Sequence, residues 1–142
     1  MEKENEKKER LVCKRWFGET GRGLGLIGSK CRSCGKVYFP KKTVCQSCWE
    51  KDNMETVPLS RKGRLVIWAA DERDMMGVGY PHICAYVDLP EGIRLFSLLS
   101  GVGTAADEAK LKKGMEVETV VERYRTDKYG NDVFIFKFRP LF

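Results

Sequence analysis

The stretch CRSCGKVYFPKKTVCQSC, residues 31–48, decides how the first part of this chain folds. It contains two Cys-x-x-Cys pairs that are separated by ten residues. Zinc prefers four soft ligands in a tetrahedron, and each pair can supply two thiolates to one ion. Gly35 follows the first pair, where a tight turn often requires a positive φ angle. The spacing therefore predicts a rubredoxin-like zinc ribbon with four ligands, Cys31, Cys34, Cys45 and Cys48.

Iron is the main alternative to zinc, because a site of four cysteines also suits iron. With either metal the protein fills all four positions, so no position remains for water or substrate. We therefore expect a structural ion and not a catalytic one. Two further cysteines lie outside the pattern. Cys84 stands in an apolar segment and is interpreted as a core residue, and Cys13 is interpreted as an incidental thiol.

The N-terminal ten residues alternate Glu and Lys and lack the apolar centre of a signal peptide. No apolar run in the 142 residues is long enough to span a bilayer. We therefore expect a cytoplasmic protein. Its six cysteines would stay reduced in that compartment, which favours metal binding over disulfides.

Residues 18–28 (GETGRGLGLIG) contain five glycines, and this density predicts a flexible linker. The segment includes a literal GxGxxG motif at Gly23, Gly25 and Gly28. A dinucleotide site requires a strand before this motif and a helix after it, whereas a cysteine pair follows here. We therefore expect no dinucleotide site in this segment.

From residue 59 onward the sequence changes to short apolar or alternating segments that predict five strands. A short helix is expected over residues 104–112, before Gly114. Five strands with a helix between the third and fourth match the OB-fold barrel, although another small barrel or a sandwich would also suit the pattern. We predict a mainly β chain in three parts: a charged arm and Gly-rich linker (1–28), a zinc ribbon (29–58) and a five-stranded OB-fold barrel (59–142), whose strands cover residues 64–70, 82–89, 93–99, 115–124 and 133–138.

The net charge of +6 is distributed unevenly and bears on a nucleic-acid hypothesis. Residues 1–62 carry 15 Lys/Arg and 8 Asp/Glu, whereas residues 63–142 carry 11 and 12. Zinc ribbons and OB folds both occur in proteins that bind single-stranded nucleic acid, and Trp68, Tyr86 and Phe96 could stack on bases. A nearly neutral barrel lacks the charge that such binding requires. The alternating pattern instead favours these rings as core residues, so nucleic-acid binding is the alternative function.

The sequence contains no recognisable catalytic constellation. It has no P-loop, no GxSxG and no HExxH motif, and its carboxylates are scattered. His82 lies two residues before Cys84, which would place both side chains on one face of a strand. We interpret His82 as a structural residue and expect no catalytic residue, hence no activity of the chain alone.

Several short motifs, in their order and spacing, resemble the acyl-CoA-associated zinc-ribbon/OB-fold proteins. They include residues 31–40 (CRSCGKVYFP), 59–68 (LSRKGRLVIW), 113–117 (KGMEV) and 138–140 (FRP). The resemblance covers about residues 29–140. The second cysteine pair departs from the usual Cys-Pro-x-Cys-Gly of that family, because Gln46 and Trp49 replace the Pro and Gly.

The resemblance implies an accessory subunit that supports assembly of a thiolase-type complex and the binding of its CoA thioester. The implied partners are a thiolase-like catalytic subunit and acyl-CoA, and the chain is also similar to the small subunit of benzoylsuccinyl-CoA thiolase of anaerobic toluene degradation. For the protein contact we expect residues 16–17, 38–39 and the loop with Met75 and Met76. CoA phosphates would attract basic residues, although a basic residue on a protein surface is more often only a solvated cation. The candidate contacts are Arg32, Lys36, Lys41, Lys42 and Arg61.

Overall fold

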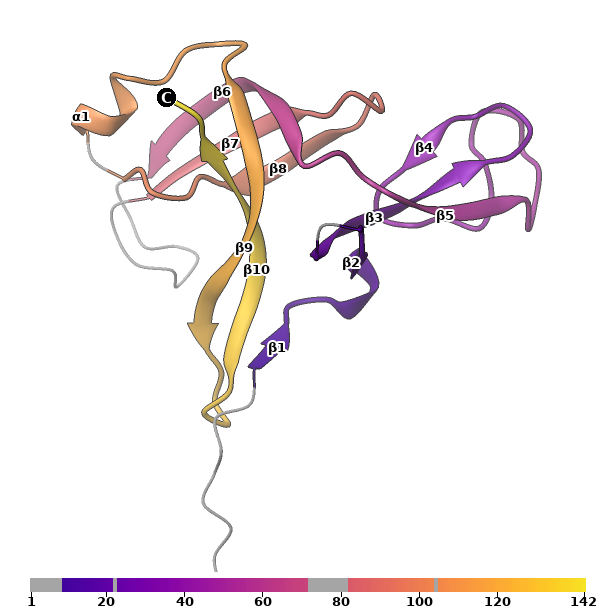
Figure 1. The fold of residues 1–142 in the computed structure, drawn as a ribbon, viewed down its shortest axis with the longest axis horizontal. Helices are drawn as coiled ribbons and strands as arrows, with labels where there is room; N and C mark the ends of the chain where they lie inside the picture. Colours follow the sequence, from indigo (N-terminus) through magenta and orange to yellow (C-terminus); the bar gives the residue numbers. More distant parts are fainter. Residues whose placement is uncertain (1–8, 22, 72–81, 104) are drawn as a thin grey trace, which may run out of the picture.

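The structure is a computed structural model that describes residues 9–21, 23–71, 82–103 and 105–142. It is mainly β, as predicted, and consists of a zinc-ribbon lobe and a barrel lobe joined by one short segment (Figure 1). The N-terminal residues form β1 (Glu9–Leu11), a 3-10 turn (Lys14–Trp16) and β2 (Phe17–Glu19), which run between the two lobes. No helix within the described ranges is long and apolar enough to cross a membrane.

The barrel lobe has the connections of an OB fold. Strand β6 pairs with both β7 and β9, β7 pairs with β8, and β9 pairs with β10, all antiparallel. A parallel bridge between Leu99 and Phe138 closes β8 onto β10. The predicted helix is present but short. The elements are β6 (Lys62–Asp71), β7 (His82–Asp88), β8 (Arg94–Leu98), α1 (Ala105–Glu108), β9 (Glu116–Thr126) and β10 (Asp132–Pro140).

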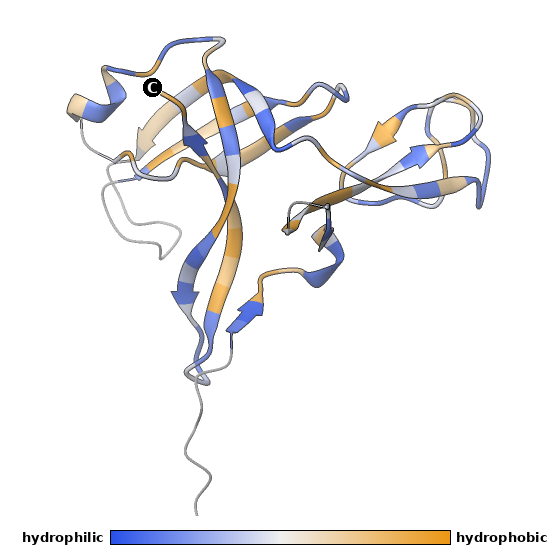
Figure 2. Cartoon of the chain, in the orientation of Figure 1, coloured by the Kyte–Doolittle hydropathy of each residue, from blue (hydrophilic) through white to orange (hydrophobic). Residues whose placement is uncertain are grey.

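The barrel is filled by alternate residues of its strands, as the period of two in a strand requires. On β7 the buried apolar side chains are Ile83, Ala85 and Val87. Apolar residues lie along the strands, whereas the far end of the β9–β10 hairpin is polar (Figure 2). A β-bulge between Leu65 and Ile67 interrupts the alternation of β6, so that Leu65 is buried whereas Ile67 is 59% exposed.

The ribbon lobe is a small sheet with β3 (Leu24–Cys31) at its centre. This strand pairs with β2, β4 (Val37–Tyr38) and β5 (Met54–Pro58). Gly28 allows β4 to approach, because a Cβ atom at this position would lie 2.5 Å from the carbonyl oxygen of Tyr38. The buried cluster of this lobe is small: Cys31, Tyr38 and Cys45, with Met54 against them. Such a lobe needs a further source of stability.

The prediction of a flexible linker over residues 18–28 is wrong. These residues form β2, a turn and most of β3, with Gly18 opposite Gly25. Gly21 and Gly23 have φ angles of +80° and +92° in the turn between the two strands. The glycines therefore serve the turn and the close pairing of a hairpin, and Leu26 anchors that hairpin in the core. The predicted boundaries of the three parts stay predictions.

The described residues of the charged arm also form regular structure. Strand β1 adds to the barrel sheet in parallel with the start of β10. Trp16 then packs between Phe39 of the ribbon and Phe136 of the barrel, with ring centroids 5.9 Å from each. Phe17 is buried and lies 6.4 Å from Phe136. Trp16 and Phe17 thus connect the two lobes, and Phe17 is too buried for the contact with a partner protein that the sequence predicts.

Candidate metal centre

Two tight turns at one end of the ribbon present the four cysteines. In the first turn the Gly35 N–H donates to the Cys31 carbonyl at 2.8 Å, and in the second the Trp49 N–H donates to the Cys45 carbonyl at 2.7 Å. Cys31 ends β3, so the central strand of the ribbon leads directly into the first turn. The Cys-x-x-Cys spacing folds in this way because each pair must turn its two thiols toward the same point.

The four sulfur atoms all lie within 4.8 Å of one another. The Cys31 and Cys48 sulfurs are 3.6 Å apart, and those of Cys34 and Cys45 are 3.4 Å apart. A tetrahedral ion with metal–sulfur bonds of about 2.3 Å would hold sulfurs about 3.8 Å apart. The donor set is four thiols and the spacing is close to this value, so these residues fit one tetrahedral metal ion.

Tyr38 is hydrogen-bonded to the cysteine cluster. Its hydroxyl accepts the Gln46 N–H at 3.0 Å, which leaves the hydroxyl proton for the Cys45 sulfur at 3.3 Å. This hydrogen bond is the main reason that the pKa of Cys45 is lowered to about 6. The same bond raises the pKa of Tyr38. Tyr38 is buried, so the expectation that it contacts a partner protein is wrong.

Two of the predicted CoA contacts lie near the ring of Tyr38 on the ribbon. The ammonium groups of Lys36 and Lys42 are 5.5 and 5.3 Å from the centroid of the Tyr38 ring, within range of a cation–π interaction. Arg32 and Lys41 are exposed on the same lobe. Six Lys/Arg against three Asp/Glu give residues 29–58 a formal charge of +3. A divalent ion with four thiolates would add −2, so these cations also balance the charge of a metal-loaded ribbon.

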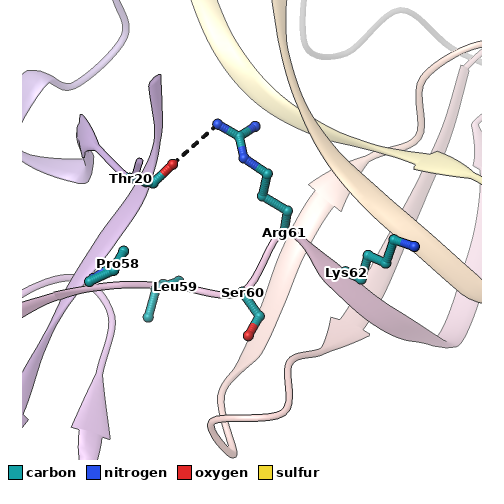
Figure 3. A pocket seen from close by; sticks show the side chains of 6 residues that line it. All are labelled: Thr20, Pro58, Leu59, Ser60, Arg61 and Lys62. Carbon is teal, nitrogen blue, oxygen red and sulfur yellow. Dashed lines mark hydrogen bonds between the residues drawn. The ribbon is translucent and has the colours of Figure 1, made fainter. Parts of the chain in front are cut away.

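Arg61 lies at the junction between the lobes and does not join the two lysines. Its Nη2 donates to the Leu24 carbonyl at 2.8 Å. It also donates to the Thr20 hydroxyl at 3.3 Å, as Figure 3 shows. These bonds connect the start of the barrel to the β2–β3 turn. Arg61 also faces a surface pocket of about 350 Å³, which is lined by Thr20, Pro58, Leu59, Ser60, Arg61 and Lys62.

The structure corrects the predicted positions of several barrel residues. His82 is buried, whereas Cys84, which was expected in the core, is only half-buried. Tyr86 and Phe96 were expected in the core, but they are 45% and 50% exposed. Their rings lie 5.4 Å apart on the outer face of β7 and β8. Trp68 is half-buried against the core. The Met75–Met76 loop lies outside the described residues.

Sequence reasoning missed a polar network that joins the two cysteine turns. The Glu50 carboxylate accepts hydrogen bonds from the Ser33 hydroxyl at 2.6 Å and the Asn53 amide at 2.7 Å. Both bonds lower the pKa of Glu50, and the bond from Ser33 has the larger effect. The signal in the sequence is weak, because three ordinary polar residues next to cysteines indicate no pairing by themselves.

Comparison with known proteins places this architecture in a family. Residues 25–55 match the model of the ChsH2 rubredoxin-like zinc ribbon domain, and residues 56–122 match that of the ChsH2 C-terminal OB-fold domain. The chain belongs to the ChsH2 zinc-ribbon/OB-fold family. This finding confirms the resemblance and the fold class that the sequence predicts. The two ChsH2 models meet inside β5, a few residues before the predicted domain boundary.

Relatives in the ChsH2 family include subunits and scaffold proteins. The chain is 35% identical over 121 residues to "Benzoylsuccinyl-CoA thiolase subunit BbsA" of Thauera aromatica, covering 85% of this chain and 80% of the relative. It is 34% identical to a "DUF35 domain-containing scaffold protein" of Pyrococcus furiosus, covering 82% and 83%. The solved structure of an Ltp2-ChsH2(DUF35) aldolase has the same fold, with a TM-score of 0.63, 23% identity, and coverage of 82% and 84%.

Proposed function

We propose that this chain is a non-catalytic, scaffold-like subunit that forms a hetero-oligomer with a thiolase-type catalytic subunit. The observation that carries the proposal is the match to BbsA over 85% of the chain, which includes both the ribbon and the barrel. Scaffold proteins of similar identity cover nearly the same length. The proposal names the thiolase class and no acyl group, because identity to BbsA (35%) and to the P. furiosus scaffold protein (34%) is nearly equal.

The metal ion of this subunit is a structural zinc held by Cys31, Cys34, Cys45 and Cys48. Support comes from the sulfur distances and from the small buried cluster of the ribbon, which provides little stability of its own. Zinc binding supplies folding free energy to ribbons of this kind. Four protein ligands close the coordination sphere, so the ion has no position for a substrate. Iron remains the competing metal, and elemental analysis of the purified chain distinguishes the two.

The ribbon also contributes to binding of the CoA thioester in this proposal. Lys36 and Lys42 both lie near the ring of Tyr38, and the other candidate cations on the ribbon are Arg32 and Lys41. Together they form a positive region that can attract CoA phosphates. Arg61 is the weakest candidate, since its guanidinium already binds Leu24 and Thr20. We further infer a cytoplasmic location, because six cysteines without a disulfide suit a reducing compartment.

Nucleic-acid binding is not favoured. The exposed Tyr86–Phe96 pair offers a stacking surface, but the barrel half of the sequence carries 11 Lys/Arg against 12 Asp/Glu. A strand of phosphates would meet little net attraction on that lobe.

The test is to produce the tagged chain alone and with each thiolase-type protein encoded in its own genome. We expect co-elution with one of them, and thiolytic cleavage of acyl-CoA by the pair but not by the chain. Turnover by the isolated, metal-loaded chain would contradict the proposal, and so would failure to associate with every thiolase tested. Tight, salt-sensitive binding of single-stranded DNA that depends on Tyr86 would favour the alternative instead.

A further inference from the structure

The two cysteine turns share one backbone conformation but not one residue type. Gly35 follows Cys34 with a φ angle of +76°, and Trp49 follows Cys48 with a φ angle of +63°. Glycine adopts positive φ readily, whereas a side chain with a Cβ atom is disfavoured there. A bulky tryptophan therefore occupies the position that, in the equivalent turn of the same ribbon, is glycine.

The Trp49 side chain gains little from burial within the ribbon. The Trp49 side chain is 71% exposed, which leaves most of the indole in water. Burial of apolar surface in the protein's own core is the usual gain from tryptophan, and Trp49 obtains little of it. A strained position that holds an exposed aromatic ring is a marker of function rather than of folding.

The peptide that carries the indole is held firmly. The Trp49 N–H binds the Cys45 carbonyl at 2.7 Å, and the Cys45 N–H binds the Glu50 carbonyl at 3.1 Å. Glu50 is tied in turn to Ser33 of the first cysteine turn at 2.6 Å. Both turns thus hold the backbone that carries the indole before any partner arrives. An anchor on a fixed backbone loses less conformational entropy on binding than an anchor on a mobile loop.

We propose that Trp49 is the anchor by which the ribbon docks into an apolar pocket of the thiolase-type catalytic subunit. This inference rests on the proposed function, which supplies the partner. A thiolase-type subunit is the occupant because the chain matches BbsA, a thiolase subunit, over 85% of its length. The contact replaces the interface sites at Trp16, Phe17 and Tyr38, whose side chains pack inside this chain.

The test is the variant Trp49→Gly, which removes the indole and also relieves the positive φ angle. We expect its zinc content and its midpoint of thermal unfolding to equal or exceed those of the wild type. The dissociation constant for the catalytic subunit should rise by at least about 30-fold, as for a central hot-spot tryptophan. Trp49→Phe should bind with intermediate affinity. Tyr129→Ala is the matched control, because Tyr129 is an equally exposed aromatic residue (74%) on the barrel, and it should bind as the wild type does.

The outcomes separate this inference from the proposed function. If the wild-type chain binds no thiolase-type protein, the proposed function fails. If the wild type binds and Trp49→Gly binds equally well, the anchor is wrong while the proposed function stands. Hydroxyl-radical footprinting of the wild-type pair gives a measurement without a variant: protection of Trp49 supports the anchor, and unchanged reactivity overturns it. A chain that elutes alone as a dimer, which Trp49→Gly dissociates, would also overturn it in favour of a second copy.

Discussion

Replacement of Phe136 by alanine tests whether the two lobes are held as one unit. Phe136 is a buried residue of β10 in the barrel. Its ring lies 5.9 Å from Trp16, 6.4 Å from Phe17 and 6.0 Å from Phe39. These three residues belong to the N-terminal arm and the ribbon, so the contacts cross from one lobe to the other.

The expected loss follows from the cavity and from the ring contacts. A buried Phe→Ala substitution costs about 3–5 kcal/mol of the free energy of unfolding. Each of the three aromatic pairs contributes about 0.5–1.5 kcal/mol. The contacts between the lobes therefore account for roughly 1.5–4.5 kcal/mol of that total. A loss of about 1.5 kcal/mol in the contacts between the lobes would raise the population of the locally opened β2–β3 hairpin about tenfold. Backbone amides of the hairpin would then exchange about tenfold faster.

The assay is hydrogen exchange of the backbone amides in β2 and β3, together with urea unfolding of the whole chain. The control is Phe138→Ala, which removes the same side chain from the same strand at a position that is 0% exposed. Phe138 packs on Phe136 inside the barrel, at 6.1 Å. We expect similar global destabilisation by both variants and faster hairpin exchange in Phe136→Ala. Equal exchange rates in the two variants would refute the idea that Phe136 couples the lobes.

Three further predictions concern the metal site and one ion pair. Cys34→Ser should abolish stoichiometric zinc in elemental analysis and unfold the ribbon, because zinc supplies the folding free energy of the ribbon. The far-ultraviolet circular dichroism of the barrel strands should persist. Full zinc occupancy in the variant would contradict this prediction. Tyr38→Phe should weaken zinc binding about 10-fold or more in competition with a chelator, because the hydroxyl that donates to Cys45 at 3.3 Å is lost. Unchanged zinc affinity would show that this hydrogen bond does not contribute to metal binding. Arg94→Met should cost less than about 1 kcal/mol at pH 7, because both partners of the Asp88 pair are partly exposed. Hydrogen bonding to Arg94 lowers the pKa of Asp88, so its contribution is present at neutral pH and is lost as the pH falls through that lowered value; unfolding curves of the two proteins should therefore converge in acid, and a constant difference would contradict the assignment.

The clustering of the four cysteines could be predicted because the geometry of a metal site constrains the short segments that carry its ligands. Two Cys-x-x-Cys turns must each place two sulfurs on one side, and the structure brings all four within 4.8 Å. The strands of the barrel were also predictable, since apolar and alternating segments indicate strands wherever they lie in a fold. Residues 82–89, for example, were predicted as a strand, and β7 spans His82–Asp88.

The face that each aromatic residue occupies was not predictable from the same pattern. Alternation says that Cys84 and Tyr86 share a face, but it does not say whether that face is the core, and in the structure Tyr86 is exposed. The bulge after Leu65 shifts the alternation of β6 and exposes Ile67. The glycine-rich hairpin was missed for a related reason, because glycine permits both a flexible linker and a close strand pair.

The sequence by itself determined the ribbon, the barrel and the order in which they occur, because cysteine spacing and strand periodicity are local properties of the chain. Only the tertiary structure decided that Trp16 and Phe17 serve the joint between the lobes, that Tyr38 donates to a cysteine, and that Trp49 stays in water. Each of these outcomes depends on how the folded chain surrounds the residue. A contact such as that between Trp16 and Phe136 joins residues far apart in the chain, and no local pattern of side chains specifies it.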